Sequence, residues 1–267
     1  MYGDEFGAEQ GQQSAPIHET PKDIAATAEA SKQVQEMTVE EEAQTSAQAR
    51  RSFEEMINQQ KARQEGGCVH GHHGGGHGHH ARNHHACPPE VANVLFSPER
   101  LKFHNPQELM QPYLATGMTA IDIGCAKGFF TIPMLELVGQ NGKVVAIDSQ
   151  PTMLEALRHN VSDEQAQHLI TLPCSEDDFK AQDYAGQADF VLMFWMLHEI
   201  EYTARAVRQA ASLLKPGGAL MLTEPSFRVS RQNFETCVDL FVAEGLEMAA
   251  EPNIWSSYGA VLRATRT

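Results

Sequence analysis

The sequence lacks an excess of positive charge, because its 20 Lys and Arg residues stand against 35 Asp and Glu residues, for a formal net charge of -15. Proteins that bind a nucleic-acid backbone draw much of their affinity from clustered Lys and Arg. The composition therefore argues against nucleic acid as a substrate or partner.

Long apolar runs and paired cysteines are also missing. No stretch approaches the roughly 20 apolar residues needed to cross a bilayer, and Met1–Glu5 has neither the basic start nor the apolar run of a secretion signal. An odd, scattered set of cysteines does not suggest a disulfide framework; they are Cys68, Cys87, Cys125, Cys174 and Cys237. We expect a soluble, cytoplasmic protein with no membrane partner, and the sequence leaves its oligomeric state open.

Large apolar side chains are scarce in the first ~65 residues, which cannot bury enough surface to offset the entropy of ordering them. Phe53, Met56 and Ile57 share one helical face, so a transient or partner-dependent helix stays open beside plain disorder. From Pro89 onward the composition is that of a globular domain. We therefore expect a low-complexity, largely disordered extension over residues 1–88 and one folded domain over residues 89–267.

A glycine-rich tract within this extension holds eight of the 13 histidines. Imidazoles bind Zn²⁺ and Ni²⁺, but the glycines leave the tract without a preorganised geometry. The candidate metal ligands are His70, His72, His73, His77, His79 and His80. The alternative is a solvated spacer whose histidines bind nothing.

The second part of the chain alternates strand and helix patterns. Strands are predicted at 119–123, 144–147, 168–172, 189–194 and 219–223, and helices at 129–137, 153–159, 203–214 and 232–244. Residues 215–218, Lys-Pro-Gly-Gly, predict a turn. Two last strands, 246–250 and 257–264, are close enough to form a hairpin. This alternation favours an α/β fold with a parallel sheet covered by helices on both faces.

The strongest local signal is a small-residue turn between a strand and a helix. Gly124, Ala126 and Gly128 allow a sharp turn and a close approach to a ligand, and the N–H groups of the new helix can hold a carboxylate. Asp148 stands 20 residues after Gly128, where a carboxylate can bind a ribose diol. A dinucleotide fingerprint would need a glycine where Phe129 stands, and the sequence has no P-loop.

These segments together resemble class I S-adenosylmethionine (SAM)-dependent methyltransferases. Residues Ile121–Gly128 are similar to the first motif of that class, which usually has glycine where Ala126 stands. Four further segments are similar to its later motifs, in the same order: Val145–Asp148, Leu172–Asp177, Leu214–Gly218 and Leu222–Pro225. The resemblance runs from about Pro98 to the C-terminus. It implies a Rossmann-like, seven-stranded, mostly parallel sheet whose one antiparallel strand comes from the final hairpin.

The resemblance also implies a SAM site. The candidate cofactor-binding residues are Asp122, Gly124, Ala126, Gly128, Asp148, Ser149, Ser175 and Glu176. Asp122 would lie near the methionyl end, Asp148 would bind the ribose hydroxyls, and Ser175 or Glu176 would meet the adenine amino group. The alternative for Asp122 is a tether between the loop and the following helix.

The acceptor side follows the fourth and fifth predicted strands. His198 is the candidate general base or acceptor-orienting group, or else a histidine bonded within the start of a helix. Glu224 ends the fifth strand and faces the same cleft or caps a turn, and Glu199 orients the histidine ring or points into solvent. Trp195 fits core or pocket wall better than a cage for a cation. The polar-Pro-Pro-aromatic motif of nucleic-acid amino methyltransferases is absent.

Within the class, the chain resembles small-molecule methyltransferases that carry a Cys-Pro segment and an Arg-x-x-x-His-Asn-Pro lead-in, here Cys87–Pro89 and Arg100–Pro106. Quinone and arsenite methyltransferases are neighbours of this group. The resemblance thus implies methyl transfer to a small-molecule acceptor, with thiol, metalloid, phenol and quinone all open.

Two alternatives involve soft or borderline metal chemistry. Thiolates favour soft ions, so Cys68, Cys87 and Cys174 could form a metalloid trio, whereas Cys125 and Cys237 fit small buried residues. The rival function is a metal-binding or partner-binding protein that uses its histidine tract, with the methyltransferase domain as an idle scaffold.

Overall fold

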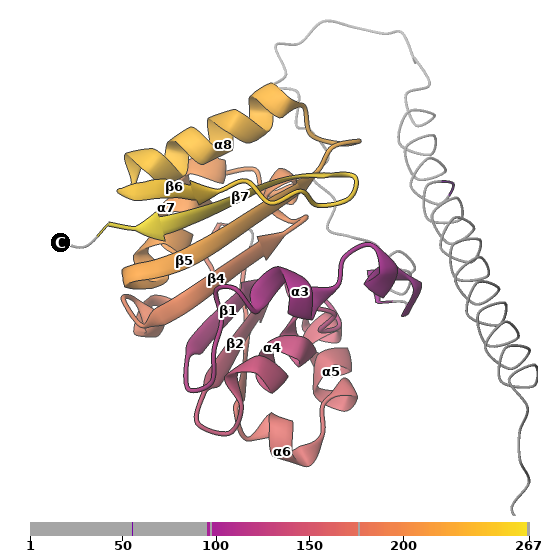
Figure 1. The fold of residues 1–267 in the computed structure, drawn as a ribbon. Helices are drawn as coiled ribbons and strands as arrows, with labels where there is room; N and C mark the ends of the chain where they lie inside the picture. Colours follow the sequence, from indigo (N-terminus) through magenta and orange to yellow (C-terminus); the bar gives the residue numbers. More distant parts are fainter. Residues whose placement is uncertain (1–54, 56–94, 97, 176, 266–267) are drawn as a thin grey trace, which may run out of the picture. The chain divides into compact units, whose positions relative to one another are not determined.

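The computed structural model describes Glu55 and residues 95–96, 98–175 and 177–265 (Figure 1). The predictions for the extension, its histidine tract and the domain boundary after residue 88 lie outside these residues, Glu55 apart. Within the described residues, no helix combines the length and the apolar character needed to cross a membrane.

Seven strands form one sheet in the order β3-β2-β1-β4-β5-β7-β6. Their bounds are β1 Thr119–Ile123, β2 Lys143–Asp148, β3 Leu169–Pro173, β4 Ala188–Phe194, β5 Leu214–Pro225, β6 Leu246–Ala250 and β7 Ser257–Ala264. Strands β1 to β5 pair in parallel, and β7 is antiparallel to both β5 and β6. The predicted Rossmann-like sheet with an antiparallel strand from the final hairpin is confirmed.

Helices cover both faces of this sheet (Figure 1). The α-helices are α3 Pro106–Met110, α4 Thr131–Val138, α5 Pro151–Asn160, α6 Asp163–Ala166, α7 Thr203–Leu213 and α8 Arg231–Ala243, and the 3-10 helices are η1 Pro98–Lys102, η2 Gln182–Tyr184 and η3 Leu197–Glu199. Alternate side chains of β4 enter different clusters: Val191 and Met193 pack with α7 and α8, whereas Phe190 and Leu192 pack with α3 and α4. The strand period of two thus divides one apolar run between two cores.

The turn predicted at residues 215–218 is wrong, because these residues belong to β5. Leu214 pairs with Ala188 and Ala219 pairs with Phe190, so residues 215–218 bulge opposite Asp189 alone. Gly217 supplies the left-handed backbone of the bulge with φ +79°. Lys215 Nζ lies 2.8 Å from Asp189 Oδ2 and anchors the bulge to β4. A Pro-Gly-Gly run marks a bend, and here the strand continues through it.

The strand order reverses between β1 and β4. The chain leaves β1 toward β2 on one side, and β4 and β5 lie on the other. In open α/β sheets, ligands bind at the carboxyl ends of the strands beside such a switch point. The loops after β1, β2, β4 and β5 therefore define the site.

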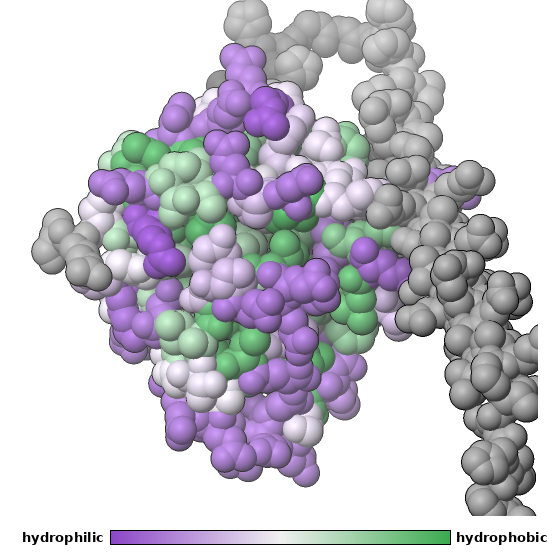
Figure 2. All heavy atoms as spheres, in the orientation of Figure 1, coloured by the Kyte–Doolittle hydropathy of each residue, from purple (hydrophilic) through white to green (hydrophobic). Residues whose placement is uncertain are grey.

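Among the described residues, the large exposed hydrophobic side chains lie in or beside different elements of the fold. Large exposed hydrophobic side chains come from four separate segments, namely Leu101, Tyr202, Val242 and Met248. On the face drawn in Figure 2, hydrophobic and hydrophilic side chains are interspersed. Isolated exposed apolar residues are normal for a folded domain.

Candidate functional site at the carboxyl edge of the sheet

The loop between β1 and α4 turns through three left-handed residues. Gly124, Ala126 and Gly128 have φ angles of +79°, +46° and +95°. At Gly124, a Cβ would lie 2.8 Å from Met196 Cβ, so the residue after Trp195 packs directly on the loop. Small residues at these positions are thus needed for backbone conformation and, at Gly124, for contact with the β4 side of the site.

Asp148 ends β2 beside this loop and is 8% exposed. Its Oδ2 accepts the Ala126 N–H at 2.9 Å, and its Oδ1 accepts the Gln150 N–H at 2.9 Å. Burial raises the pKa of Asp148, and backbone hydrogen bonds from Gln150, Ala126 and Ser149 oppose that rise. Each carboxylate oxygen has two acceptor positions, so a backbone donor on each still leaves room for a ligand hydroxyl.

Asp122 lies in β1 and is 2% exposed. Thr131 Oγ1 at the start of α4 donates to Asp122 Oδ2 at 2.6 Å. Burial raises the pKa of Asp122 to about 7, the Thr131 hydrogen bond lowers it, and the charge of Asp148 raises it further. Asp122 therefore does tie the strand to the helix, and it also forms a repelling pair of buried carboxylates with Asp148.

The remaining cofactor candidates take different positions. Ser149 is exposed just after β2. Ser175 Oγ donates to Asp177 Oδ1 at 2.8 Å, so this hydroxyl is held within its own loop. Glu176 lies outside the described residues.

On the acceptor side, the structure brings His198 and Glu224 together. His198 Nδ1 lies 2.5 Å from Glu224 Oε2, and the Leu197 N–H donates to Glu224 Oε1 at 2.9 Å. Glu224 is buried, with 1% of its surface exposed. On the other ring nitrogen, His198 Nε2 lies 3.9 Å from Glu199 Oε1. The orienting carboxylate is therefore Glu224 from the neighbouring strand, and Glu199 lies on the other side of the ring.

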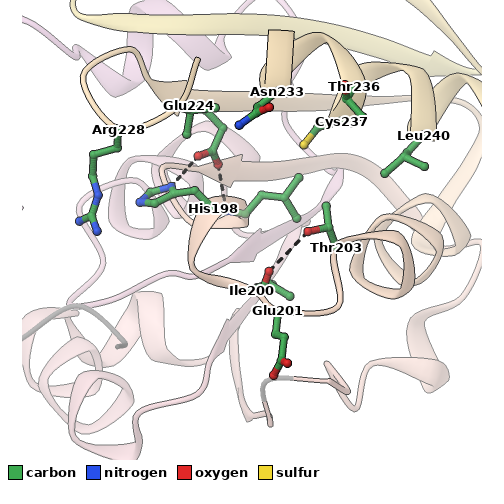
Figure 3. Close-up of a pocket in the computed structure, with 12 residues that line it drawn as sticks. His198, Ile200, Glu201, Thr203, Glu224, Arg228, Asn233, Thr236, Cys237 and Leu240 are labelled. Carbon is green, nitrogen blue, oxygen red and sulfur yellow. Dashed lines mark hydrogen bonds and ion pairs between the residues drawn. The ribbon is translucent and has the colours of Figure 1, made fainter. Parts of the chain in front are cut away.

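These residues line a cavity of about 590 Å³ between η3, the end of β5 and α8 (Figure 3). Its apolar wall comes from Leu197, Ile200, Val229 and Leu240, and its polar lining consists of His198, Glu201, Thr203, Glu224, Arg228, Asn233, Thr236 and Cys237. Figure 3 draws Arg228 and His198 among the residues that line this cavity. A cavity of this size holds a small organic molecule.

The described cysteines, Cys125, Cys174 and Cys237, are protonated thiols near neutral pH. Burial raises the pKa of Cys174 to about 11 and that of Cys125 well above its usual value. Burial and then the charge of Glu224 raise the pKa of Cys237 to about 11. Cys125 is buried as predicted, but Cys237 is only half-buried and lines the cavity. Among the described residues, no group of three or more His, Cys, Asp or Glu side chains is arranged to hold a metal ion.

Sequence reasoning missed an aromatic cluster around Arg100. This side chain is 5% exposed, and its Cζ lies 4.4 Å from the ring centroid of Phe129 and 5.3 Å from that of Trp195. His104 is 0% exposed and accepts a hydrogen bond from Arg100 Nε at 3.4 Å. Trp195 thus packs against a cation of its own chain. The lead-in motif marked Arg100 and His104, but it did not show what they contact.

Comparison with known proteins gives the family. A family model described as a methyltransferase domain matches residues 114–258. The chain is 26% identical over 141 residues to a demethylmenaquinone methyltransferase from Oceanobacillus iheyensis, covering 50% of this chain and 56% of the relative. It is 29% identical over 115 residues to the aklanonic acid methyltransferase DauC from a Streptomyces species, covering 42% of this chain and 50% of the relative. The chain thus spans about half the length of these curated relatives.

The fold has a solved counterpart. A SAM-dependent methyltransferase from Aquifex aeolicus superposes with a TM-score of 0.60 at 21% identity, covering 67% of this chain and all of that one. With the family model matching more than half of the sequence, the conclusion is direct: this chain belongs to the methyltransferase domain family and has the fold of a class I SAM-dependent methyltransferase.

Proposed function

We propose that this protein transfers a methyl group from SAM to a hydroxyl group of a small molecule bound in the cavity beside His198. The observation that carries the proposal is the His198–Glu224 pair on the cavity wall, with 2.5 Å between Nδ1 and Oε2. An ionised carboxylate only accepts hydrogen bonds, so Nδ1 carries the proton and Nε2 presents its lone pair. This is the arrangement of a general base.

The chemistry of the donor set fits SAM. Asp122 and Asp148 are buried carboxylates that repel each other across the β1 loop. A ligand that carries an ammonium group and a sulfonium relieves this repulsion, and a ribose diol matches the remaining acceptor positions of Asp148. When bound, SAM supplies an electrophilic methyl group that leaves a neutral thioether behind.

The residues of this chain then have separate tasks. His198 Nε2 accepts the proton of the acceptor hydroxyl, and Glu224 stabilises the imidazolium through Nδ1. Glu199 Oε1, 3.9 Å from Nε2, lies close enough to favour the same charge. The cavity wall holds the acceptor in line, and alignment of this kind contributes about 7–11 kcal/mol to such reactions.

A hydroxyl acceptor is favoured over a thiol-assisted metalloid. Cys174, the described member of the predicted metalloid trio, has a pKa near 11 and is protonated at neutral pH. Soft ions bind the thiolate form. Relatives named for demethylmenaquinone and aklanonic acid favour a small organic acceptor over a metalloid.

The test uses purified full-length protein, labelled SAM and a panel of hydroquinones, phenols, thiols and metalloid oxyanions. With the acceptor that turns over, His198→Ala should lower the methyl-transfer rate by about 10²–10⁴-fold and leave SAM affinity unchanged. His159→Ala, on the exposed end of α5, is the matched control. Near-normal turnover of His198→Ala on that acceptor would refute the base assignment and favour an acceptor that arrives already ionised.

A further inference from the structure

Trp195 has an unusual backbone for a bulky residue. Its φ is +58°, in the left-handed region that favours glycine. Such conformations persist only where surrounding contacts determine them, and they gather at functional sites. Trp195 directly follows β4, at the switch point of the sheet.

The residues after Trp195 connect the two halves of the site. Met196 packs on Gly124 of the cofactor loop, where any Cβ would meet Met196 Cβ at 2.8 Å. Two residues further, His198 meets Glu224. The direction in which the backbone leaves Trp195 therefore sets the position of the His198 imidazole relative to the β1 loop.

A chain of hydrogen bonds holds the indole ring. Trp195 Nε1 donates to Ser257 Oγ at 2.9 Å, and Ser257 Oγ donates to the Trp255 carbonyl at 3.0 Å. On the backbone, the Trp195 N–H donates to the Thr223 carbonyl at 2.7 Å. Trp195 is thus tied to both β5 and the start of β7.

The Trp255 carbonyl also accepts a second hydrogen bond, from the segment Arg100–Pro106. His104 Nε2 lies 3.0 Å from the Trp255 carbonyl oxygen, and Arg100 Nε donates to His104 Nδ1 at 3.4 Å. Burial lowers the pKa of His104 to about 3, and the charge of Arg100 lowers it too, so the ring is neutral with its proton on Nε2. Arg100 Cζ lies 5.3 Å from the Trp195 ring centroid and closes the cycle.

We propose that Trp195 is a positioning residue for methyl transfer, held by this cycle of Arg100, His104, Trp255 and Ser257 so that Met196 contacts the β1 loop while His198 faces Glu224. The inference rests on the proposed function only in taking His198 as the base. Alignment of reacting groups is sensitive to displacements well under 1 Å. The loss of one hydrogen bond at Trp195 should therefore displace the His198 ring while the protein stays folded.

The test follows the His198–Glu224 hydrogen bond directly and needs no acceptor. Full-length protein with nitrogen-labelled histidine should show a downfield Nδ1 proton, assigned by its loss in His198→Gln. Ser257→Ala and Trp195→Phe each remove the same hydrogen bond from opposite ends. In both variants this proton should move upfield and exchange with water about five- to tenfold faster. The double variant should shift the proton by less than the sum of the two single variants, because the two share the Trp195–Ser257 hydrogen bond.

Three further variants separate positioning from general stability. Ser257→Thr keeps the hydroxyl and should restore the wild-type resonance. Ser212 is exposed on α7 and its hydroxyl donates to the Gln209 carbonyl, so Ser212→Ala should leave the resonance unchanged. Leu246→Ala creates a cavity at the start of β6, at the opposite end of the strands, and should lower the unfolding temperature without moving the His198 proton.

An unchanged His198 proton in both Ser257→Ala and Trp195→Phe would overturn the proposal. So would an equal shift in Leu246→Ala. Either result would leave the base assignment untouched, since that assignment depends on turnover of His198→Ala.

Discussion

Ala126 carries a methyl group at a left-handed position of the cofactor loop, with φ +46°. A left-handed backbone costs a residue other than glycine about 1–2 kcal/mol. The loop keeps this conformation because the Ala126 N–H is bound by Asp148 Oδ2 at 2.9 Å. Asp148 therefore shapes the loop and also offers oxygen atoms to a ligand.

Asp148→Ala should weaken SAM binding by about ten- to hundredfold, because a charged acceptor of two ligand hydroxyls is lost. The SAM affinity of Asp148→Asn should lie between those of Asp148→Ala and the wild type, since one oxygen acceptor remains. Calorimetry measures the affinity, with the exposed Asp183→Ala as the control. Equal SAM affinity in wild type and Asp148→Ala would show that the ribose is bound elsewhere.

Asp122 makes stability depend on pH. Its pKa is raised from 3.8 to about 7 in the folded protein, so between these values the folded state keeps a proton that the unfolded state releases. Stability should therefore fall as pH rises from about 4 to about 7, by a few kcal/mol (~1.4 kcal/mol for each unit of pKa difference), and stay level above.

Denaturant unfolding at pH 5 and pH 8 checks this dependence, and Asp122→Asn should flatten it. A cationic ligand lowers the pKa of a neighbouring carboxyl. SAM binding at pH 6.5 should accordingly release a proton, seen as a buffer-dependent binding enthalpy. Matching pH profiles for wild type and Asp122→Asn would contradict the assignment.

At the scale of elements, the approach of α5 to the cofactor loop depends on Gly128. A Cβ there would lie 2.4 Å from Leu157 Cδ1, and Leu157 is fully buried. Gly128→Ala should destabilise the protein by about 1–2 kcal/mol from its backbone and by about 1–3 kcal/mol more from overpacking.

Gly117→Ala is the matched control for this contact. Gly117 has φ +86°, close to the +95° of Gly128, but nothing lies within 4 Å of its would-be Cβ. The difference between the two variants in free energy of unfolding isolates the helix–loop contact. An equal loss of unfolding free energy in Gly117→Ala and Gly128→Ala would show that α5 can shift to accommodate the added Cβ at no cost.

The elements themselves were largely predictable, because strands and helices differ in their apolar period. Both strands of the final hairpin occur at the predicted residues, 246–250 and 257–264. The start of β5 was not predictable, since a bulge opposite Asp189 depends on strand pairing and not on local preference. Lys215 signals that bulge only once Asp189 is known to face it.

The candidate site was predictable in its residues more than in its contacts. His198 and Glu224 were both selected, yet their hydrogen bond depends on the neighbouring positions of β4 and β5. His104 and the Trp255 carbonyl are 151 residues apart, and no local pattern reports such a pair. Sequence periodicity thus locates elements, and the strand order decides which side chains meet.

At the scale of the whole molecule, the described cofactor and acceptor residues lie between residues 100 and 257. Deletion of residues 1–86 should therefore leave SAM affinity unchanged. We also predict that the full-length protein binds Ni²⁺ or Zn²⁺ through its candidate histidines and that the deletion removes most of this binding. Calorimetry with SAM and with Ni²⁺ measures both. A full-length variant with the six candidate histidines changed to alanine separates metal binding from the deletion itself, and lost SAM binding in the truncated protein would contradict the prediction.

Strand β7 lies between β5 and β6, although it comes last in sequence among the described strands. During synthesis, the cofactor loop, Asp148 and His198 leave the ribosome well before Trp255 and Ser257, and only the last strand brings those two to the carboxyl edge. Contacts between distant segments form late in folding. A nascent chain can thus complete its SAM loop and the His198–Glu224 pair while the Trp195 ring still lacks its partners, and a premature stop before Trp255 should release a protein that lacks the contacts that position Trp195.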